Sequence, residues 1–129
     1  MPIQFDLVAP ERAMATEQAT MVVAPGVEGD FGVMEGHAPM LSVLRPGVVT
    51  ATLTGGDTKR YTVFGGLAEV GPDRCTILAD DVHDEAAVTP EMIATRVAAA
   101  EKALETAIGD DAPRAAQYLN DLKSLAPAG

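Results

Sequence analysis

The stretch VVTATLTGGDTKRYTVFGGLAEVGPDRCTILA, residues 48–79, is a series of short β-type runs separated by turn signals. The runs are rich in Val, Thr, Ile and aromatic residues, which favour strands, and they cover residues 48–53, 59–64, 67–70 and 74–79. Gly55-Gly56-Asp57 predicts a hairpin between the first two runs. Gly71-Pro72-Asp73 predicts another reversal, because proline presets φ and glycine permits the turn. The stretch therefore predicts antiparallel strands.

The residues before this stretch continue the same pattern. Ile3, Phe5 and Leu7 alternate with polar residues, as in a half-buried strand. Residues 19–24 form another β-type run that ends at Pro25-Gly26. Short strands that recur about every ten residues indicate an antiparallel sandwich or barrel. The strands do not alternate with helices, so a Rossmann-type nucleotide fold is not expected.

The hydrophobic period changes after Asp80. Thr89-Pro90-Glu91 is typical of a helix start, with threonine as N-cap and proline in the first turn. Apolar residues then recur at steps of three and four, on one expected helical face: Ile93, Val97, Ala100, Leu104 and Ile108. Gly109 is a natural stop, and Asp110 or Asp111 can cap a second helix. That helix has the apolar stripe Ala115, Leu119, Leu122 and Ala126, and we expect it to end at Pro127.

These two patterns predict two domains, a β domain over residues 1–84 and a helical hairpin over residues 85–129. The helical faces are rich in alanine, which buries little area per residue. At about 25 cal/mol per Å² the hairpin gains less from packing than a leucine-rich one would. We therefore expect the hairpin to dock weakly and to be able to move relative to the β domain.

Charge and cysteine content narrow the class of protein. The formal net charge is -10 and the pI is about 4.4, which argues against nucleic acid and anionic lipid as partners and in favour of basic protein surfaces. Cys75 is the only cysteine, so an intramolecular disulfide is excluded; its strand-like surroundings predict a buried structural thiol. No secretory signal is recognisable, and no apolar run approaches the ~20 residues that span a bilayer. A soluble cytoplasmic protein without direct bilayer insertion is expected.

Three stretches of the sequence contain residue types that could form a catalytic, metal or phosphate site. His37 could act as a base for Ser42, but no local signature surrounds that serine, so a structural or contact role is favoured. His83 lies among acidic residues that could hold a metal, although the spacing fits a solvated linker better: Asp80, Asp81, Asp84 and Glu85. Residues 29–36 lack the GxxxxGK[ST] phosphate-binding pattern. The sequence thus predicts no catalytic, nucleotide-binding or metal residue and no cofactor.

The most unusual stretch is GDFGVMEGHAPML, residues 29–41, where three glycines, a histidine and a proline predict a shaped, rigid corner. Together with LRPGVV (44–49), FGGLAEV (64–70) and TILAD (76–80), it resembles the epsilon subunit family of F-type ATP synthases, the counterpart of the mitochondrial delta subunit. The four pieces occur in the family's order. The resemblance covers nearly the whole chain.

The resemblance implies an α+β fold, with an antiparallel β-sandwich of about ten strands followed by a two-helix hairpin. It also implies a non-catalytic rotor subunit of the central stalk that links the gamma subunit to the c ring and couples proton flow to ATP synthesis. Such a subunit lies peripherally on the cytoplasmic face of the bacterial inner membrane. In the family the corner meets the c ring, so Asp30 and His37 are expected ring contacts, and Gly32 and Gly36 would permit close approach. The strands at 59–64 or 67–70 are suggested to face gamma.

The sequence departs from the family at two places. Ala9 replaces a serine that contacts the ring in some relatives. Several relatives bind ATP through an Ile/Leu-Asp-x-x-Arg-Ala motif, whereas residues 88–93 read Val-Thr-Pro-Glu-Met-Ile, with Thr89 for aspartate and Met92 for arginine. The second helix carries only Arg114 and Lys123 as basic residues that could meet the acidic alpha/beta catalytic head. ATP sensing is therefore expected to be absent and inhibition weak.

Two other classes of function were considered. A small β-barrel protein that binds a metal or ligand, similar to a cupin, would use His37 or His83, but two distant histidines make a poor ligand set. A free-standing acidic regulator that docks onto a basic enzyme surface would also fit the charge.

Overall fold

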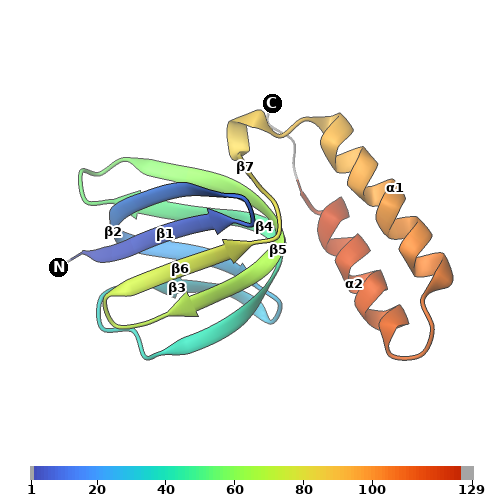
Figure 1. The fold of residues 1–129 in the computed structure, drawn as a ribbon, viewed down its shortest axis with the longest axis horizontal. Coiled ribbons are helices and arrows are strands. Elements are labelled where there is room, and N and C mark those ends of the chain that lie inside the picture. The colour runs from blue at the N-terminus through green and yellow to red at the C-terminus, as the bar shows by residue number, and fades with distance from the viewer. Residues whose placement is uncertain (1, 126–129) are drawn as a thin grey trace.

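A computed structural model describes residues 2–125 of the chain, and Figure 1 shows two parts, a β-sandwich and a helical hairpin beside one end of it. The elements follow one another as β1 (Ile3–Ala9), β2 (Arg12–Gly26), β3 (Gly29–Val33), β4 (Met40–Leu53), β5 (Thr58–Val70), β6 (Arg74–Ala79), β7 (Val82–Asp84), the short 3₁₀ helix η1 (Glu85–Ala87), α1 (Pro90–Thr106) and α2 (Asp111–Lys123). This order of strands, then helices, confirms the expected fold class.

The strands form one sheet that folds back on itself. Its order is β1-β6-β5-β4-β2-β3, and β1 also pairs with β2, so the sheet closes around a core. All pairs are antiparallel except β1 with β6, which is parallel. The sequence pattern predicted antiparallel pairing throughout. It could not show that the first strand closes the barrel against a strand from much later in the chain.

Seven strands are found among the described residues, and the expectation of about ten is therefore too high. The reason is that three strands are long, with 15, 14 and 13 residues in β2, β4 and β5. Strand β5 continues through Gly65 and Gly66, which have φ values of +104° and +140° and let the strand bend without ending. The sequence pattern treated these glycines as a break between two strands.

The core of the sandwich is built from the alternating apolar positions of the strands. Ile3, Phe5 and Leu7 of β1 are completely buried, as their period of two predicted, and they meet Val63 of β5 and Ile77 of β6 in one cluster. Cys75 belongs to the same cluster. Burial raises the pKa of its thiol to about 12, so the expected structural role of Cys75 is confirmed.

The helices begin where the sequence predicted and pair as a hairpin. The Thr89 hydroxyl accepts a hydrogen bond from the Met92 amide at 3.2 Å, which caps α1. Ile93, Ala100, Leu119 and Leu122 are buried. Ile108 is 84% exposed and lies beyond the end of α1, so its place on the buried face was predicted wrongly. The expected contributions of Ala126 and Pro127 fall outside the described residues.

The hairpin packs against the sandwich through a small second cluster. Phe64 of β5 is buried with Ala100, Leu119 and Leu122, and Val97, Leu104 and Leu125 pack around them. Helix α2 lies between α1 and the sandwich (Figure 1) and contacts β4. No helix within residues 2–125 is both long and apolar enough to cross a membrane.

Candidate functional site

The glycine-rich stretch 29–39 is half strand and half turn rather than one corner. Residues Gly29–Val33 form β3, which pairs with β2 and lies at the end of the sheet order. The turn that follows contains Gly36, with φ +86°, and leads to β4. The described part of the chain shows no second strand beside β3, so the outer backbone edge of β3 is available to a partner.

Asp30 is exposed at the beginning of β3. One of its carboxylate oxygens lies 2.5 Å from Arg45 Nη2, and the other terminal nitrogen of Arg45 donates to the Gly26 carbonyl at 2.5 Å. The Asp30 side chain is 62% exposed, so solvent weakens this ion pair and the carboxylate can exchange partners. Asp30 thus already has an arginine partner within its own chain, which the sequence did not indicate.

His37 and Gly36 lie in the turn at the other end of β3. The Gly36 amide donates to the Pro72 carbonyl at 2.7 Å, which ties this turn to the turn between β5 and β6. His37 Nδ1 lies 2.7 Å from the Ala38 carbonyl; because a carbonyl only accepts, Nδ1 carries the proton. The ring is therefore oriented by its own neighbour, and Nε2 is left for a further contact. Nothing in this arrangement links His37 to Ser42.

The structure does not bring Asp30 and His37 together. Asp30 is the second residue of β3 and His37 lies in the turn after its end, and each strand residue adds a rise of about 3.3 Å between them. Gly32 lies between them, and a Cβ added there would meet only the Met21 side chain at 3.7 Å, an ordinary contact. The four expected contact residues therefore follow one sheet edge from end to end instead of forming a compact site.

A row of exposed or partly exposed apolar side chains crosses four strands on the outer face of the sandwich. Val43 pairs with Leu67, Leu67 with Leu78, and Leu78 with Val8, so the four residues are direct cross-strand neighbours. Val43, Leu67 and Leu78 are 53%, 37% and 40% exposed, and Leu41, two positions from Val43, is 68% exposed. We call Val8, Val43, Leu67 and Leu78 the apolar row. Contiguous exposed apolar side chains of this kind mark an interaction surface.

The sequence analysis did not find this row as a unit. It suggested the strands at 59–64 or 67–70 as a partner surface, and the structure distinguishes the two. On the outer face of the first, Thr62 and Phe64 are buried, whereas Leu67 in the second is open. The missing information was the register, because four residues separated in the sequence become neighbours only through strand pairing.

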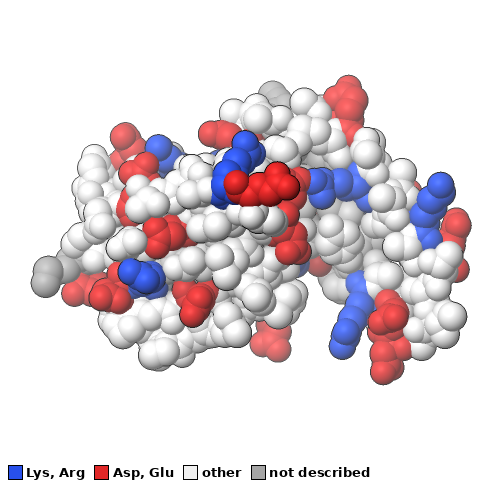
Figure 2. All heavy atoms as spheres, viewed as in Figure 1, with Lys and Arg blue, Asp and Glu red and all other residues white. Residues whose placement is uncertain are grey.

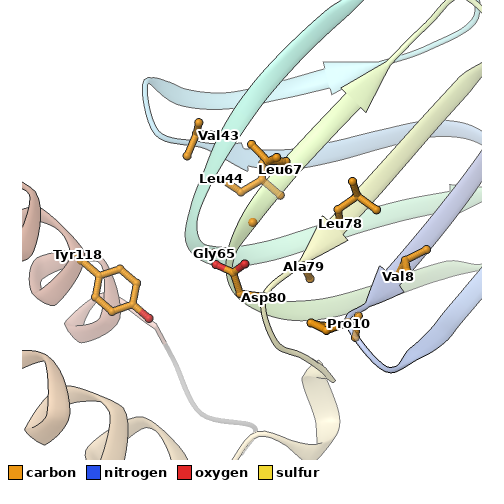
Figure 3. Close-up of a pocket in the computed structure, with 12 residues that line it drawn as sticks. Val8, Pro10, Val43, Leu44, Gly65, Leu67, Leu78, Ala79, Asp80 and Tyr118 are labelled. Carbon is orange, nitrogen blue, oxygen red and sulfur yellow. The ribbon is translucent and has the colours of Figure 1, made fainter.

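The apolar row forms one wall of a groove of about 580 Å³ between the sandwich and the hairpin. Figure 3 shows Tyr118 projecting from α2 toward this wall, with Asp80 and Gly65 between Tyr118 and the row. Tyr118 is 37% exposed, so its ring is partly open to solvent. The groove is thus lined mainly by the sandwich and the junction, and Tyr118 is the side chain that the hairpin contributes to it.

The acidic junction after β6 is occupied by interactions within the chain. The Asp81 carboxylate binds Arg96 and lies 3.1 Å from His83 Nε2, and Glu85 pairs with Arg60 at 3.1 Å. Asp84 caps η1 by accepting from the Ala86 amide at 3.0 Å. No group of three or more potential metal ligands is found within the described residues, and these contacts fit the structural explanation of the junction.

Charged side chains occur on both parts of the molecule on the face that Figure 2 shows. In Figure 2 acidic side chains are spread over both parts of the molecule, and the basic ones visible in this view lie next to acidic ones. Thr89 and Met92, the two residues at which the sequence departs from the expected nucleotide motif, are joined by the capping hydrogen bond of α1. The first residue of this segment, Val88, is buried. The segment is therefore used to begin the helix.

Comparison with known proteins gives one consistent result. Residues 2–85 match the family described as ATP synthase, Delta/Epsilon chain, beta-sandwich domain. The chain is 46% identical over 107 residues to an ATP synthase epsilon chain of Rhodospirillum rubrum, covering 83% of this chain and 80% of that one. It is 42% identical over 122 residues to an ATP synthase epsilon chain of Rhodopseudomonas palustris (strain BisB18), covering 95% and 90%.

Solved structures agree in fold. A chain in the cryo-EM structure of the Euglena gracilis mitochondrial ATP synthase (OSCP/F1/c-ring) superposes with a TM-score of 0.71 at 20% identity, covering 95% of this chain and 80% of that one. A chain in the central stalk/c-ring structure of the Tetrahymena thermophila mitochondrial ATP synthase gives a TM-score of 0.60 at 18% identity, covering 70% and 72%.

Proposed function

This chain belongs to the delta/epsilon chain family of ATP synthases, and from that premise we propose that it is the central-stalk subunit that links gamma to the c ring in a proton-translocating F-type ATP synthase. It couples proton flow to ATP synthesis by joining the two and contributes no catalytic residue itself. As part of that complex it lies peripherally on the cytoplasmic face of the bacterial inner membrane. Residues 1–84 and 85–129 act as two domains.

The observation that carries the proposal is the apolar row. Its side chains lie on the outer face of the sandwich, where solvent reaches them. They offer a stalk partner a continuous apolar surface across four strands. Burying apolar side chains is the main source of free energy in stable protein association. We assign this surface to gamma. The row lies on different residues from the edge strand β3, which leaves β3 for the ring.

Binding to a catalytic head tests the gamma assignment. The head contains alpha, beta and gamma and is stripped of its own epsilon chain, and its ATPase rate is recorded in the same samples. The wild-type chain binds tightly and stoichiometrically, and Leu67→Glu weakens binding at least about tenfold, because a charge is placed in the apolar contact.

Met21→Glu is the matched control, since Met21 is an apolar strand residue with the same 37% exposure as Leu67 but lies outside the row. This variant keeps wild-type affinity for the head. Equal losses for both variants would contradict the gamma assignment. Failure of the wild-type chain to bind at micromolar concentration would contradict the stalk function itself.

The ring contact runs along β3 and the turn after it. Asp30 offers a carboxylate to a basic group of the polar loops of the c ring, in exchange for its exposed pair with Arg45. His37 offers Nε2, because Nδ1 is held by Ala38. Gly32 and Gly36 carry no side chains, so the backbone of the ring loops can come close to this edge.

Proton pumping tests the ring contact separately from gamma binding. In reconstituted membranes Asp30→Ala lowers ATP-driven proton pumping per ATP hydrolysed, while ATPase activity and binding to the head stay unchanged. Glu28→Ala is the control, because Glu28 is an exposed acidic residue in the adjoining turn that is outside the proposed contact. Unchanged pumping with Asp30→Ala would contradict the role of Asp30.

The hairpin contacts the alpha/beta head only weakly and does not sense ATP. Thr89 and Met92 stand where ATP-binding relatives have aspartate and arginine, and the Thr89 hydroxyl already caps α1. Isothermal titration calorimetry of the isolated chain with ATP should give no binding at millimolar concentration. A measurable dissociation constant in or below that range would overturn this part of the proposal.

A further inference from the structure

One arginine adds polar contacts to the apolar packing between the hairpin and the sandwich. Arg96 of α1 places its guanidinium carbon 3.8 Å from the centre of the Phe64 ring in β5, and it forms an ion pair with Asp81. A planar guanidinium can stack flat on an aromatic ring while its N–H groups bind a carboxylate, whereas an ammonium, as a compact point charge, cannot stack in this way. Apart from these contacts, the small Phe64 cluster holds the hairpin.

The partners of Arg96 are themselves fixed by the sandwich. One Asp81 oxygen accepts from the Val82 amide at 3.0 Å, and the other lies 3.1 Å from His83 Nε2. His83 also meets the Phe64 ring edge-on, with the ring centres 6.0 Å apart. Arg96 therefore binds a preformed socket, which we call the Arg96 socket: Phe64, Asp81 and His83.

The position of the hairpin decides the shape of the groove beside the apolar row. Tyr118 is the one groove residue among those described that comes from the hairpin; the others come from the sandwich and the junction. Without the Arg96 contacts only the apolar cluster around Phe64 and the contact of α2 with β4 hold the hairpin, so we expect α2 to leave the sandwich more often and Tyr118 to leave the groove with it. The row then remains as a flat sheet face.

We propose that the gamma contact is composite: gamma occupies the groove between the apolar row and Tyr118, and Arg96 is the positioning residue that keeps Tyr118 in place. The proposal rests on the stalk function above. Gamma is the occupant because the groove continues the row to which gamma is assigned and shares Val8, Val43, Leu67 and Leu78 with it. Asp80 at the groove and the net charge of -10 favour a gamma segment that carries apolar side chains beside basic ones.

Thermodynamic linkage gives the consequence. A partner that contacts both the row and Tyr118 binds the docked hairpin better than the released one, so gamma binding stabilises docking. By reciprocity, release of the hairpin weakens gamma binding by the same factor. The docked hairpin then contributes to the affinity for gamma, even if it never reaches the catalytic head.

Hydrogen exchange in α2, measured by mass spectrometry on the full chain alone and bound to the epsilon-stripped head, tests the coupling. Binding of the wild-type chain slows exchange in α2 as well as in the strands of the row. Arg96→Ala speeds α2 exchange in the free chain and weakens head binding about fivefold or more. Tyr118→Ala weakens binding while β-strand exchange in the free chain stays unchanged.

Two further variants keep the test specific. Arg96→Lys retains the charge but loses the planar stack, so it behaves like Arg96→Ala in part. Lys102→Ala removes an exposed basic residue of α1 outside the socket and leaves both readouts unchanged. Exchange in the sandwich strands reports whether each variant is folded. If the wild-type chain binds but α2 exchange does not slow, or if Arg96→Ala releases the hairpin without loss of affinity, the composite contact is wrong while the stalk function stands. Failure of the wild-type chain to bind overturns the stalk function as well.

Discussion

The sandwich and the hairpin are held together in different ways. The sandwich closes on itself through the double pairing of β1, and Phe5, Ile3 and Leu7 are completely buried in its core. The hairpin depends on a few side chains around Phe64 and on the Arg96 socket. Because free energy from burial follows apolar area, the two parts should differ in stability even though they contact each other. The chain thus combines a rigid docking surface with an element that can be released.

The largest effect is expected from the sandwich core. Phe5→Ala removes a completely buried ring and should lower the free energy of unfolding by about 3–5 kcal/mol. Urea denaturation followed by circular dichroism measures this change. Both parts should lose structure in this variant at lower urea, because the hairpin has no other surface to pack on. A loss below about 1 kcal/mol would contradict the assignment of Phe5 to the centre of the core.

A substitution in the hairpin cluster should separate the two parts. Leu122 of α2 is completely buried in the Phe64 cluster. Leu122→Ala should lower the free energy of unfolding of the hairpin by about 2–4 kcal/mol. Hydrogen exchange is expected to become faster in α1 and α2 and to stay unchanged in β1, β5 and β6. If hydrogen exchange became faster by the same factor in the sandwich and in the hairpin, the two parts would unfold as one cooperative unit, and the proposed difference in stability would be wrong.

Alkaline pH should weaken the sandwich through Cys75. The unfolded thiol ionises near pH 9, whereas burial raises the pKa of the folded thiol to about 12. Below pH 9 both states are protonated and stability is unaffected; above it the unfolded state loses the proton first, so stability falls up to about pH 12. The expected loss is about 1 kcal/mol between pH 9 and 10, where the unfolded thiol is still partly protonated, and urea denaturation measures it.

Cys75→Ala is the control for this effect. This substitution should remove most of the loss of stability between pH 9 and 10, because alanine has no proton to lose when the chain unfolds. Desolvation also raises the pKa of Tyr61, which adds loss at still higher pH. A loss that persists unchanged in Cys75→Ala would have to be assigned to other groups.

The smallest effect is expected at the start of α1. Thr89→Ala removes the hydroxyl that caps the helix and should lower hairpin stability by about 1 kcal/mol. Thr89→Ser restores the hydrogen bond and should recover most of it. Faster exchange limited to the first turn of α1 in Thr89→Ala measures the loss, and no difference between alanine and serine would contradict the capping role.

The sequence predicted what depends on local pattern. The period of two in β1, the capped start at Thr89 and the burial of Cys75 follow from neighbouring residues alone, and all three are found. The count of strands went wrong at Gly65-Gly66, where a positive φ bends a strand that the sequence pattern ended. The predicted burial of Ile108 was wrong because α1 ends at Thr106, before this residue.

The candidate sites show the same limit more clearly. The motif placed Asp30 and His37 in one corner, but Asp30 lies at the beginning of β3 and His37 lies beyond its end. A strand this rich in glycine has the same sequence pattern as a loop. The apolar row and the Arg96 socket depend on pairing between distant strands and on helix docking. No local signal indicates which of several apolar strand residues stay uncovered, so these surfaces needed the three-dimensional structure.

Photo-cross-linking from the apolar row tests the central claim, docking of this chain onto gamma, most directly. A photoreactive phenylalanine analogue replaces Leu67 in the chain assembled into the complete ATP synthase, and mass spectrometry identifies the cross-linked subunit. The account predicts cross-links to gamma from Leu67 and none to gamma from the same analogue at exposed Met21 of β2, a strand outside the apolar row. Cross-links from Leu67 to the alpha/beta head or the c ring, with none to gamma, would contradict it.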